Sequence, residues 1–417
     1  MRKNAVVFAL SVAIEVPGAL AQKPDEPDQT VEVYGKLYPE VVRQHGVGAT
    51  GPGRTTADFA GAPDGEKSIV SRNEMESSNS RFGVRGGIKL GGDLKGIFQL
   101  ETEFHVDQND SGFATRDSFV GLSHKRWGTI KIGRMDTPFK GYADDVSFLG
   151  VSSGNFVSTS ELNRNLPFGG SNAGRFHERR TNAVDYETPE IVGFQGEIQY
   201  SNGVAGGEGD EEDTATRHPH AWSAGIKWER GPFAVGVGHE IHRDLFGLSN
   251  NVPSDSMASA DDPLVRSNDR ATEVMIKYEW NIDKFGIHQF EIDGNRKEWT
   301  EDPTITGKAR SYKNYSYLGI WDARWLPEWR TQIHYVQATR GNCAIVAMSC
   351  STRGLGGFQI TAGAAYYFSK RTYLFFMAQW LRNDFSANFA SGTQDASIGE
   401  NVRQYALGIN YEFSASF

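Results

Sequence analysis

The end of the chain alternates between apolar and polar residues over a length that an extended strand explains best. Within residues 401–417, every second side chain from position 405 is apolar or aromatic: Tyr405, Leu407, Ile409, Tyr411, Phe413, Ala415 and Phe417. The residues between them are small or polar, for example Gln404, Asn410 and Glu412. Successive side chains of a strand point to opposite faces, so this pattern predicts a strand with one apolar and one polar face.

The same period of two recurs along the chain, and the polar faces carry charge. In residues 80–90 the apolar face is formed by Phe82, Val84, Ile88 and Leu90. The opposite face carries Arg81, Arg85 and Lys89. Similar splits occur in residues 94–106, 273–280, 289–293 and 330–335. A single dry core would not accept so many charged faces, whereas a wide barrel encloses water and turns its apolar faces to lipid.

Short and long breaks separate the predicted strands in alternation. The short turns fall near residues 91–93, 125–128, 189–193, 230–231, 281–286, 326–328 and 369–371. The long breaks lie near 44–76, 107–114, 135–178, 203–219, 243–269, 299–312, 340–357 and 384–400. Outer-membrane barrels have tight periplasmic turns and long outer loops. Because the breaks divide the chain into sixteen strands, we predict an all-β fold, a 16-stranded antiparallel transmembrane β-barrel, with no linker that divides it.

Composition supports an exported membrane protein. Phe, Tyr and Trp number 25, 15 and 9, and Tyr and Trp suit the aromatic girdles of a barrel. Residues 1–21 predict a signal peptide, with Arg2 and Lys3 before an apolar stretch and a small-residue cleavage motif that ends at Ala21. Residues 22–417 would then form the barrel. The net charge of −9 argues against a nucleic-acid partner.

The two cysteines, Cys343 and Cys350, lie close together in one long predicted loop. In an oxidising compartment such a pair predicts a disulfide, with two free thiols as the alternative. The sequence shows no metal-ligand spacing and no catalytic or cofactor motif. Its histidines are scattered, and the Gly-rich residues 46–54 lack the lysine of a phosphate loop. The acidic residues 208–213 favour a solvated loop over a calcium site.

Several stretches taken together resemble the trimeric general-diffusion porins of Gram-negative outer membranes. They are SRFGVRGGIKLGGDLKGIFQLETEF (80–104), RDSFVGLSHKRWGTIKIGRMDTPF (116–139), RRTNAVDYETPEIVGFQGEIQYSNG (179–203), AAYYFSKRTYLFFMAQW (364–380) and the terminal strand. The resemblance implies a homotrimer in the outer membrane of a Gram-negative bacterium. It also implies passive diffusion of small hydrophilic solutes and ions, and a long third loop folded into the pore. Lipid and lipopolysaccharide are the expected surroundings, and we expect no enzymatic activity.

The resemblance and the strand pattern together assign residues to the pore. The third loop is residues 135–178, and its acids are Asp144, Asp145 and Glu161. The family's basic wall carries over onto Arg81, Arg116 and Arg179, and Arg85, Arg134 and Arg180 join them by strand parity or by closeness in sequence. Glu101 and Glu103 are the expected lumen acids. Such a wall favours anions, unless its arginines pair with these acids and only stiffen the barrel.

Two other functions fit the same pattern. A substrate-specific channel for small anionic solutes would saturate with one solute class, whereas a general pore would not. A closed barrel that acts as an adhesin or enzyme would pass no current.

Overall fold

The computed structural model describes residues 29–49, 69–77, 79–107, 112–142, 145–146, 148–150, 158–170, 174–202, 217–260, 262–282, 285–325, 327–390 and 396–417. The expected signal peptide (1–21) and the acidic residues 208–213 lie outside these ranges. Among the residues described, no helix is long and apolar enough to cross a membrane.

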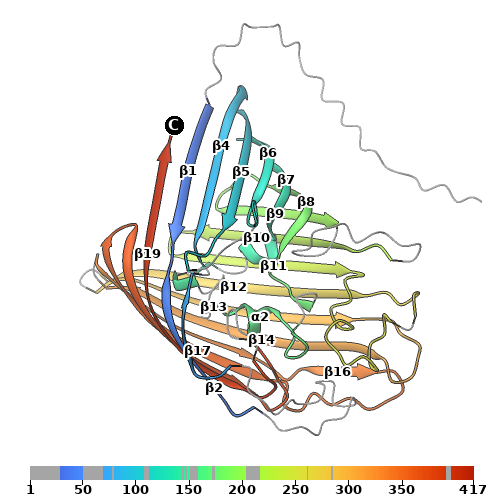
Figure 1. The fold of residues 1–417 in the computed structure, drawn as a ribbon. Helices are drawn as coiled ribbons and strands as arrows, with labels where there is room; N and C mark the ends of the chain where they lie inside the picture. Colours follow the sequence, from blue (N-terminus) through green and yellow to red (C-terminus); the bar gives the residue numbers. More distant parts are fainter. Residues whose placement is uncertain are drawn as a thin grey trace, which may run out of the picture.

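The described chain forms one antiparallel sheet of nineteen strands and three short helices (Figure 1). The strands of the first half are β1 (Gln29–Leu37), β2 (Glu40–Val47), β3 (Arg72–Glu76), β4 (Arg81–Gly91), β5 (Leu94–Glu103), β6 (Ser118–His124), β7 (Gly128–Asp136), β8 (Arg179–Glu187) and β9 (Phe194–Asn202). Those of the second half are β10 (His220–Arg230), β11 (Phe233–Arg243), β12 (Asn268–Ile282), β13 (Gly286–Thr300), β14 (Ala309–Arg324), β15 (Trp329–Ala338), β16 (Asn342–Ile345), β17 (Gly357–Ser369), β18 (Thr372–Asn383) and β19 (Asn401–Ser416). The helices are α1 (Pro138–Tyr142), the 3₁₀ turn η2 (Phe148–Gly150) and α2 (Ser160–Arg164).

The sheet closes on itself, because β1 pairs with both β4 and β19. Three barrel strands are interrupted. β19 pairs with β1 over its final part and with β2 over its first part, so β1 and β2 form one strand. β3 and β4 together pair with that strand, and β15 and β16 both pair with β14. The nineteen segments therefore make sixteen barrel strands, which confirms the predicted fold.

The alternation of the last strand has the predicted orientation. Leu407 and Ile409 of β19 are exposed on the outside of the barrel, whereas Gln404 and Asn410 are fully buried on its inside. The same arrangement holds in β13, where Phe290 is exposed. An exposed apolar face on every side is what lipid requires of a barrel.

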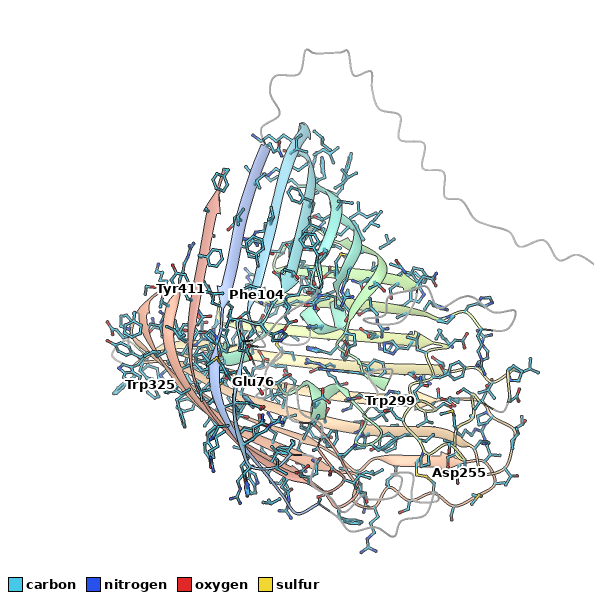
Figure 2. The ribbon with its side chains drawn as sticks, in the orientation of Figure 1. Glu76, Phe104, Asp255, Trp299, Trp325 and Tyr411 are labelled. Atoms are coloured by element: carbon cyan, nitrogen blue, oxygen red, sulfur yellow. A yellow bond between two sulfur atoms is a disulfide. The ribbon has the colours of Figure 1, made fainter. Side chains whose placement is uncertain are left out.

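Short turns and long loops lie at opposite ends of the barrel. In Figure 2, Trp325 lies at the short-turn end and Asp255 lies among the long loops. Near the short turns, the indole rings of Trp280, Trp321 and Trp325 surround the His288 ring, with the Trp325 centroid 4.9 Å from it. An aromatic cluster at this level fits one of the girdles of a membrane barrel.

The interior at the long-loop end is partly filled by apolar side chains. Phe176 and Leu248, which come from two different loops, pack with the inward-facing Trp299 and Tyr312 of β13 and β14. The Trp299 indole N–H donates to the Gly174 carbonyl oxygen at 2.6 Å. The loops therefore enter the mouth of the barrel and pack against its wall.

Candidate functional site

The loop between β7 and β8 folds into the barrel, as expected for the third loop. Its two ends are joined by a hydrogen bond from the Thr137 amide to the Glu178 carbonyl oxygen at 3.3 Å. The loop contains α1, η2 and α2, with α1 on the inner faces of β9–β11 and α2 on those of β13–β15 and β17. Figure 1 shows α2 within the barrel outline. The predicted insertion of the loop is confirmed.

Helix α1 lies directly on the wall because β10 and β11 carry glycines beneath it. A Cβ atom at Gly236 would lie 2.0 Å from the carbonyl oxygen of Tyr142, and one at Gly225 would lie 2.6 Å from the Tyr142 Cβ atom. A Cβ atom at Gly238 would lie 3.0 Å from the Phe139 Cα atom. No side chain fits between this helix and the wall, so these glycines set how close the loop approaches.

Helix α2 is held by a buried ion pair. The Arg164 Nε atom lies 2.9 Å from a Glu273 carboxylate oxygen, and neither side chain is exposed. Asn163 donates to the same carboxylate at 2.6 Å, and the Lys297 Nζ atom donates to the Leu162 carbonyl oxygen at 2.9 Å. A buried ion pair is costly unless its remaining hydrogen bonds are satisfied. Here the Glu273 carboxylate accepts from Asn163 of the loop and, at 3.3 Å, from Asn295 of the wall, so the pair fixes the position of α2.

Phe148 and Phe168 of the loop also contact the wall. The Phe148 ring lies 4.0 Å from the Arg330 guanidinium, and the Phe168 ring packs edge-on against Tyr312 at 5.1 Å. Phe156 lies outside the described residues.

The loop acids are bound to basic side chains rather than turned freely to the lumen. Asp145 accepts hydrogen bonds from the ammonium groups of Lys227 and Lys277 on the wall. Burial raises the pKa of Asp145, but these two bonds outweigh it and hold the pKa below its usual value. Glu161 is buried, with the Arg175 guanidinium 3.1 Å from its carboxylate. Asp144 lies outside the described residues.

Three of the predicted wall arginines that face the lumen also have acidic partners. Arg116 pairs with Glu101 and lies 3.7 Å from Glu103, so the two expected lumen acids neutralise it. The Arg179 guanidinium contacts Asp117 at 2.5 Å and Asp136 at 2.9 Å.

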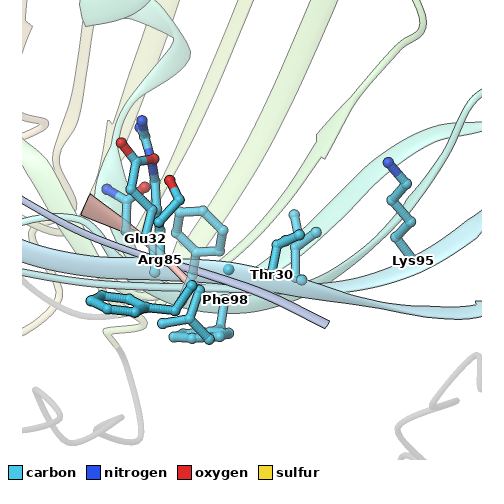
Figure 3. Close-up of a pocket in the computed structure, with 13 residues that line it drawn as sticks. Thr30, Glu32, Arg85, Lys95 and Phe98 are labelled. Carbon is cyan, nitrogen blue, oxygen red and sulfur yellow. The ribbon is translucent and has the colours of Figure 1, made fainter. Parts of the chain in front are cut away.

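The third paired arginine is Arg85, which contacts Glu32 at 2.8 Å. Figure 3 shows this pair on one face of the strands, with the Phe98 ring on the opposite face. The view illustrates the two-sided strands of this wall, with the Arg85–Glu32 pair and Phe98 on opposite faces.

Arg180 lies under the loop rather than on the lumen surface. Its side chain is 2% exposed, and its guanidinium lies 2.7 Å from the His242 ring and 3.8 Å from Glu240. The Phe176 ring stacks on His242 at 4.6 Å. We therefore place Arg180 in the base that holds the loop.

Arg81 lies in a hollow of the inner wall with three other basic side chains, Lys36, Arg85 and Arg371. Tyr34 and Glu412 also line this hollow. Within the described residues, neither Arg81 nor Lys36 forms an ion pair. These two cations therefore supply positive charge to the lumen that no carboxylate neutralises at contact distance.

Arg134 of β7 is also without an acidic partner among the residues that the structure describes. It is half-buried, and its Nε atom makes no hydrogen bond there.

Sequence reasoning missed Lys36 and Lys227 as lumen residues. It also missed Arg371, in the short turn between β17 and β18, as part of the hollow around Arg81. Strand parity offered a signal for the two lysines, because residues two positions apart lie on one face. Lys36 shares the inner face with Tyr34 and Tyr38, and Lys227 shares it with Gly225. Nothing in the sequence indicates that Lys227 meets Asp145, which is 82 positions away.

The open path lies along the first strands. On the second half of the barrel the inner side chains Glu291, Asn314 and Gln359 are fully buried beneath the loop. On β4 and β5, by contrast, Arg85 and Lys95 are exposed on the inner face. A solute in the lumen therefore meets the basic wall of β1, β4 and β5 first.

The described residues contain no group of three His, Cys, Asp or Glu side chains that could hold a metal ion.

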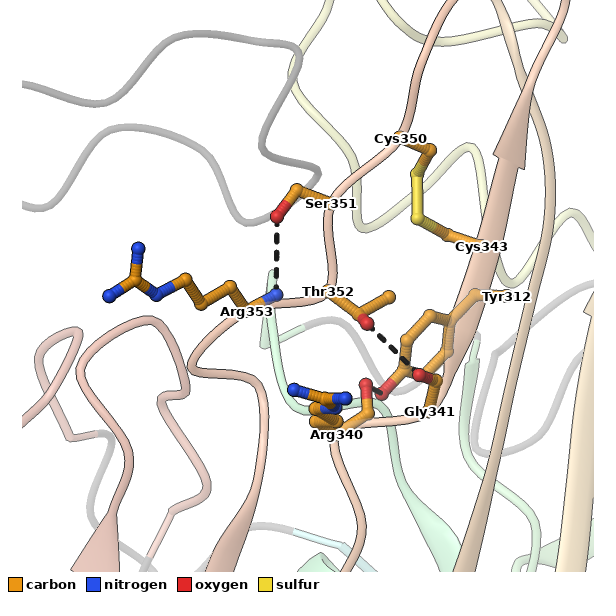
Figure 4. Close-up of a disulfide and its surroundings, with 8 residues drawn as sticks. All are labelled: Tyr312, Arg340, Gly341, Cys343, Cys350, Ser351, Thr352 and Arg353. Carbon is orange, nitrogen blue, oxygen red and sulfur yellow. Dashed lines mark hydrogen bonds between the residues drawn. A yellow bond between two sulfur atoms is a disulfide. The ribbon is translucent and has the colours of Figure 1, made fainter.

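The predicted disulfide between Cys343 and Cys350 is confirmed, with Cα atoms 5.9 Å apart. It closes a small loop at the mouth of the barrel (Figure 4). Beside it, the Tyr312 hydroxyl donates to the Arg340 carbonyl oxygen at 3.1 Å, and Thr352 donates to the Gly341 carbonyl oxygen at 2.9 Å. The bridge thus fixes a loop whose base is bound to β14.

A closed antiparallel barrel of sixteen strands, apolar outside and charged inside, with a loop that narrows its lumen, defines a transmembrane channel. The chain belongs to the Gram-negative porin family, whose model matches residues 7–386. It is an outer-membrane porin, and the family consists of channels rather than enzymes.

Similar proteins agree with this assignment. The chain is 25% identical over 305 residues to the major outer membrane protein P.IB of Neisseria meningitidis, covering 66% of this chain and 84% of the relative. It is 30% identical over 173 residues to the P.IB protein of Neisseria gonorrhoeae, covering 41% of this chain and 43% of the relative.

Solved structures show the same fold. An anion-selective porin from Comamonas acidovorans superimposes with a TM-score of 0.65 at 20% identity, covering 93% of this chain and 100% of that chain. A trimer form of OmpT from Vibrio cholerae superimposes with a TM-score of 0.56 at 14% identity, covering 92% and 99%.

Proposed function

We propose that this porin passes small hydrophilic solutes by diffusion and prefers anions. The observation that carries the proposal is that a loop acid is neutralised by basic side chains, whereas two cations of the wall are not neutralised by acids. The loop acid Asp145 is bound by two lysines, whereas Arg81 and Lys36 on the opposite wall form no ion pair. Low-dielectric walls focus such a field into the lumen. The solved Comamonas acidovorans structure, which has the same fold, is itself named an anion-selective porin.

The test is the reversal potential of the refolded protein in a planar bilayer with a salt gradient. In the double variant Arg81→Ala/Arg116→Ala we expect the anion-to-cation permeability ratio to fall severalfold. One unpaired cation is lost, and Glu101 and Glu103 lose the guanidinium that neutralises them. A unit charge at 4 Å contributes about 1 kcal/mol even in water.

Arg126→Ala is the control, because Arg126 is exposed in the short turn between β6 and β7. An unchanged reversal potential in the double variant would remove these arginines from the selectivity mechanism. If wild-type conductance instead saturates with one small anion, the protein is a substrate-specific channel.

We also propose a homotrimer that is surrounded by lipid and lipopolysaccharide. The trimer form of the OmpT neighbour supports the assembly. Native mass spectrometry of the detergent-solubilised protein tests the subunit number, and stepwise conductance in groups of three would agree with it.

A leader of residues 1–21 is part of the same proposal, since an outer-membrane protein must be exported. Sequencing the N-terminus of the protein from membranes tests it, with residue 22 expected first.

A further inference from the structure

The outer face of β17, β18 and β19 carries a groove whose floor is made of alanines. Ala362 pairs with Ala378 across β17 and β18, and Ala378 pairs with Tyr405 of β19. Ile360 and Trp380 form the adjacent pair toward the long loops. Small side chains between large ones leave a hollow on a surface that faces hydrocarbon, and a single acyl chain fits such an apolar groove.

Basic side chains gather where this groove approaches the long-loop end. Arg403 lines the groove opposite Trp380, and Arg382 follows Trp380 by two positions on the same face of β18. On the next strand, His45 pairs with Arg403 and Arg43 pairs with Tyr405. All four side chains are exposed. These strands lie together on one side of the barrel (Figure 1).

Among the residues that the structure describes, no Asp or Glu forms an ion pair with this cluster. The outward positions of β15, β17, β18, β19, β2 and β3 carry no Asp or Glu within the described residues. Asp384 lies in the loop just beyond β18, and it forms no ion pair with Arg382 or Arg403 there. Arg43 instead donates to the neutral Asn73 side chain at 3.0 Å.

Two outward arginines elsewhere on the same rim are neutralised. Arg296 of β13 lies 2.8 Å from Glu298, and Arg270 of β12 lies 3.4 Å from the same carboxylate. The face formed by β17–β19 and β2 thus combines cations that lack a carboxylate with an apolar groove beside them.

We propose that this face binds lipopolysaccharide, with one acyl chain in the groove over Ala362 and Ala378 and phosphate groups on Arg382, Arg403 and Arg43. The long loops of an outer-membrane barrel face outward, so these arginines lie at the headgroup level of the outer leaflet. Guanidinium groups bind phosphate through paired hydrogen bonds. The inference deepens the proposed lipid partner and rests on that orientation, but it does not depend on ion selectivity.

The test is a binding titration of the refolded full-length protein in detergent with purified lipopolysaccharide. We expect Arg382→Ala/Arg403→Ala to lose roughly tenfold or more in apparent affinity, because two charge-assisted contacts are removed. Ala378→Phe, which fills the groove and leaves every charge in place, should also weaken binding. The matched control is Arg270→Ala/Arg296→Ala, which removes the same charge at the same rim and should bind as the wild type does.

Three further measurements decide the occupant. Dephosphorylated lipopolysaccharide should bind the wild type weakly and should not distinguish the variants. An equal loss of affinity in the matched control would overturn the proposal. It would also be overturned if phosphatidylglycerol bound the wild type as tightly as lipopolysaccharide does and lost as much affinity in Arg382→Ala/Arg403→Ala. If Arg382→Ala/Arg403→Ala alters the subunit number in native mass spectrometry, the face is a contact between copies of the chain. Conductance of the same variants is measured in parallel. If it is retained while binding is lost, lipopolysaccharide binding and channel function are independent of each other.

Discussion

Asp145 joins the loop to two cations of the wall. Its carboxylate accepts hydrogen bonds from Lys227 and Lys277, whose side chains are mostly buried. The Val146 amide next to it donates to Glu291 at 2.9 Å. Removing this charge would therefore leave Lys277 without its carboxylate and Lys227 with Glu229 alone, at 3.1 Å.

We predict that Asp145→Asn raises the anion-to-cation permeability ratio severalfold. The two lysines lose a neutralising charge, and a more positive lumen admits anions more readily. Reversal potentials in a salt gradient measure the change. Asp93→Asn, in the exposed turn between β4 and β5, is the control. A lower ratio in Asp145→Asn would contradict the assignment.

Glu301 gives the outer loop that follows β11 a dependence on pH. Burial raises the pKa of Glu301 to about 7, although the Ser249 amide and hydroxyl donate to it at 2.7 and 2.5 Å. A carboxyl whose pKa is raised on folding stabilises the fold fully below its usual pKa of 4.5, and this contribution is lost as pH rises through about 7. The shift corresponds to on the order of 3 kcal/mol.

We therefore predict that amide hydrogen exchange at Ser249 and Ala258, corrected for intrinsic rates, is slower at pH 5.5 than at pH 8. Ala258 belongs to this contact because its amide donates to the Ser249 hydroxyl. Glu301→Gln should remove the difference. Asp244 in the same loop provides an internal comparison. Burial raises its pKa, but Arg266 and the His218 amide outweigh this and hold the pKa below its usual value. Protection that rises with pH would refute the role of Glu301.

The partners and burial of single residues were the features least predictable from the sequence. Strand parity indicated that Arg85 and Glu101 face the lumen, but it could not pair Arg164 with Glu273, which is 109 positions away. Arg180 shows the same limit. Closeness to Arg179 suggested a pore residue, yet a β-bulge in the pairing of β7 with β8 and the overlying loop bury it. Ion-pair partners depend on how a loop folds back on the wall, which alternation along a strand does not encode.

At the scale of elements, the glycines of β10 and β11 determine how closely α1 approaches the wall. We predict that Gly236→Val lowers single-channel conductance, because its side chain would meet the Tyr142 carbonyl and push the helix into the lumen. Gly319→Val is the matched control, since a Cβ atom there meets nothing within 4 Å. Equal conductance in both variants would show that the loop adjusts without narrowing the path.

Alternation and turn residues predicted most strands, but they did not predict where strands are interrupted. The structure divides the first barrel strand between β1 and β2, at Tyr38 and Pro39. Proline lacks the amide that a ladder requires, so an interruption at this position has a physical cause. The split between β15 and β16 has no comparable signal in the sequence.

At the scale of the molecule, the barrel is divided along its length into a covered and an open half. The ion pair of Arg164 with Glu273 and the apolar packing of Phe176 and Trp299 hold loops against the second half. The wall of β1, β4 and β5 stays exposed to the lumen. Closure of the sheet makes the two halves one frame, and we propose that a solute passes along the basic side.

This division predicts the reactivity of single cysteines placed on the inner wall. Arg85→Cys or Lys95→Cys should react rapidly with a charged thiol reagent and reduce the current, because both positions are exposed. Asn314→Cys should react slowly, since Asn314 is fully buried beneath the loop. The native cysteines form the disulfide and supply no background thiol. Rapid block through position 314 would mean that the loop leaves the second half during conduction, and the solute path would then have to be drawn across the whole lumen.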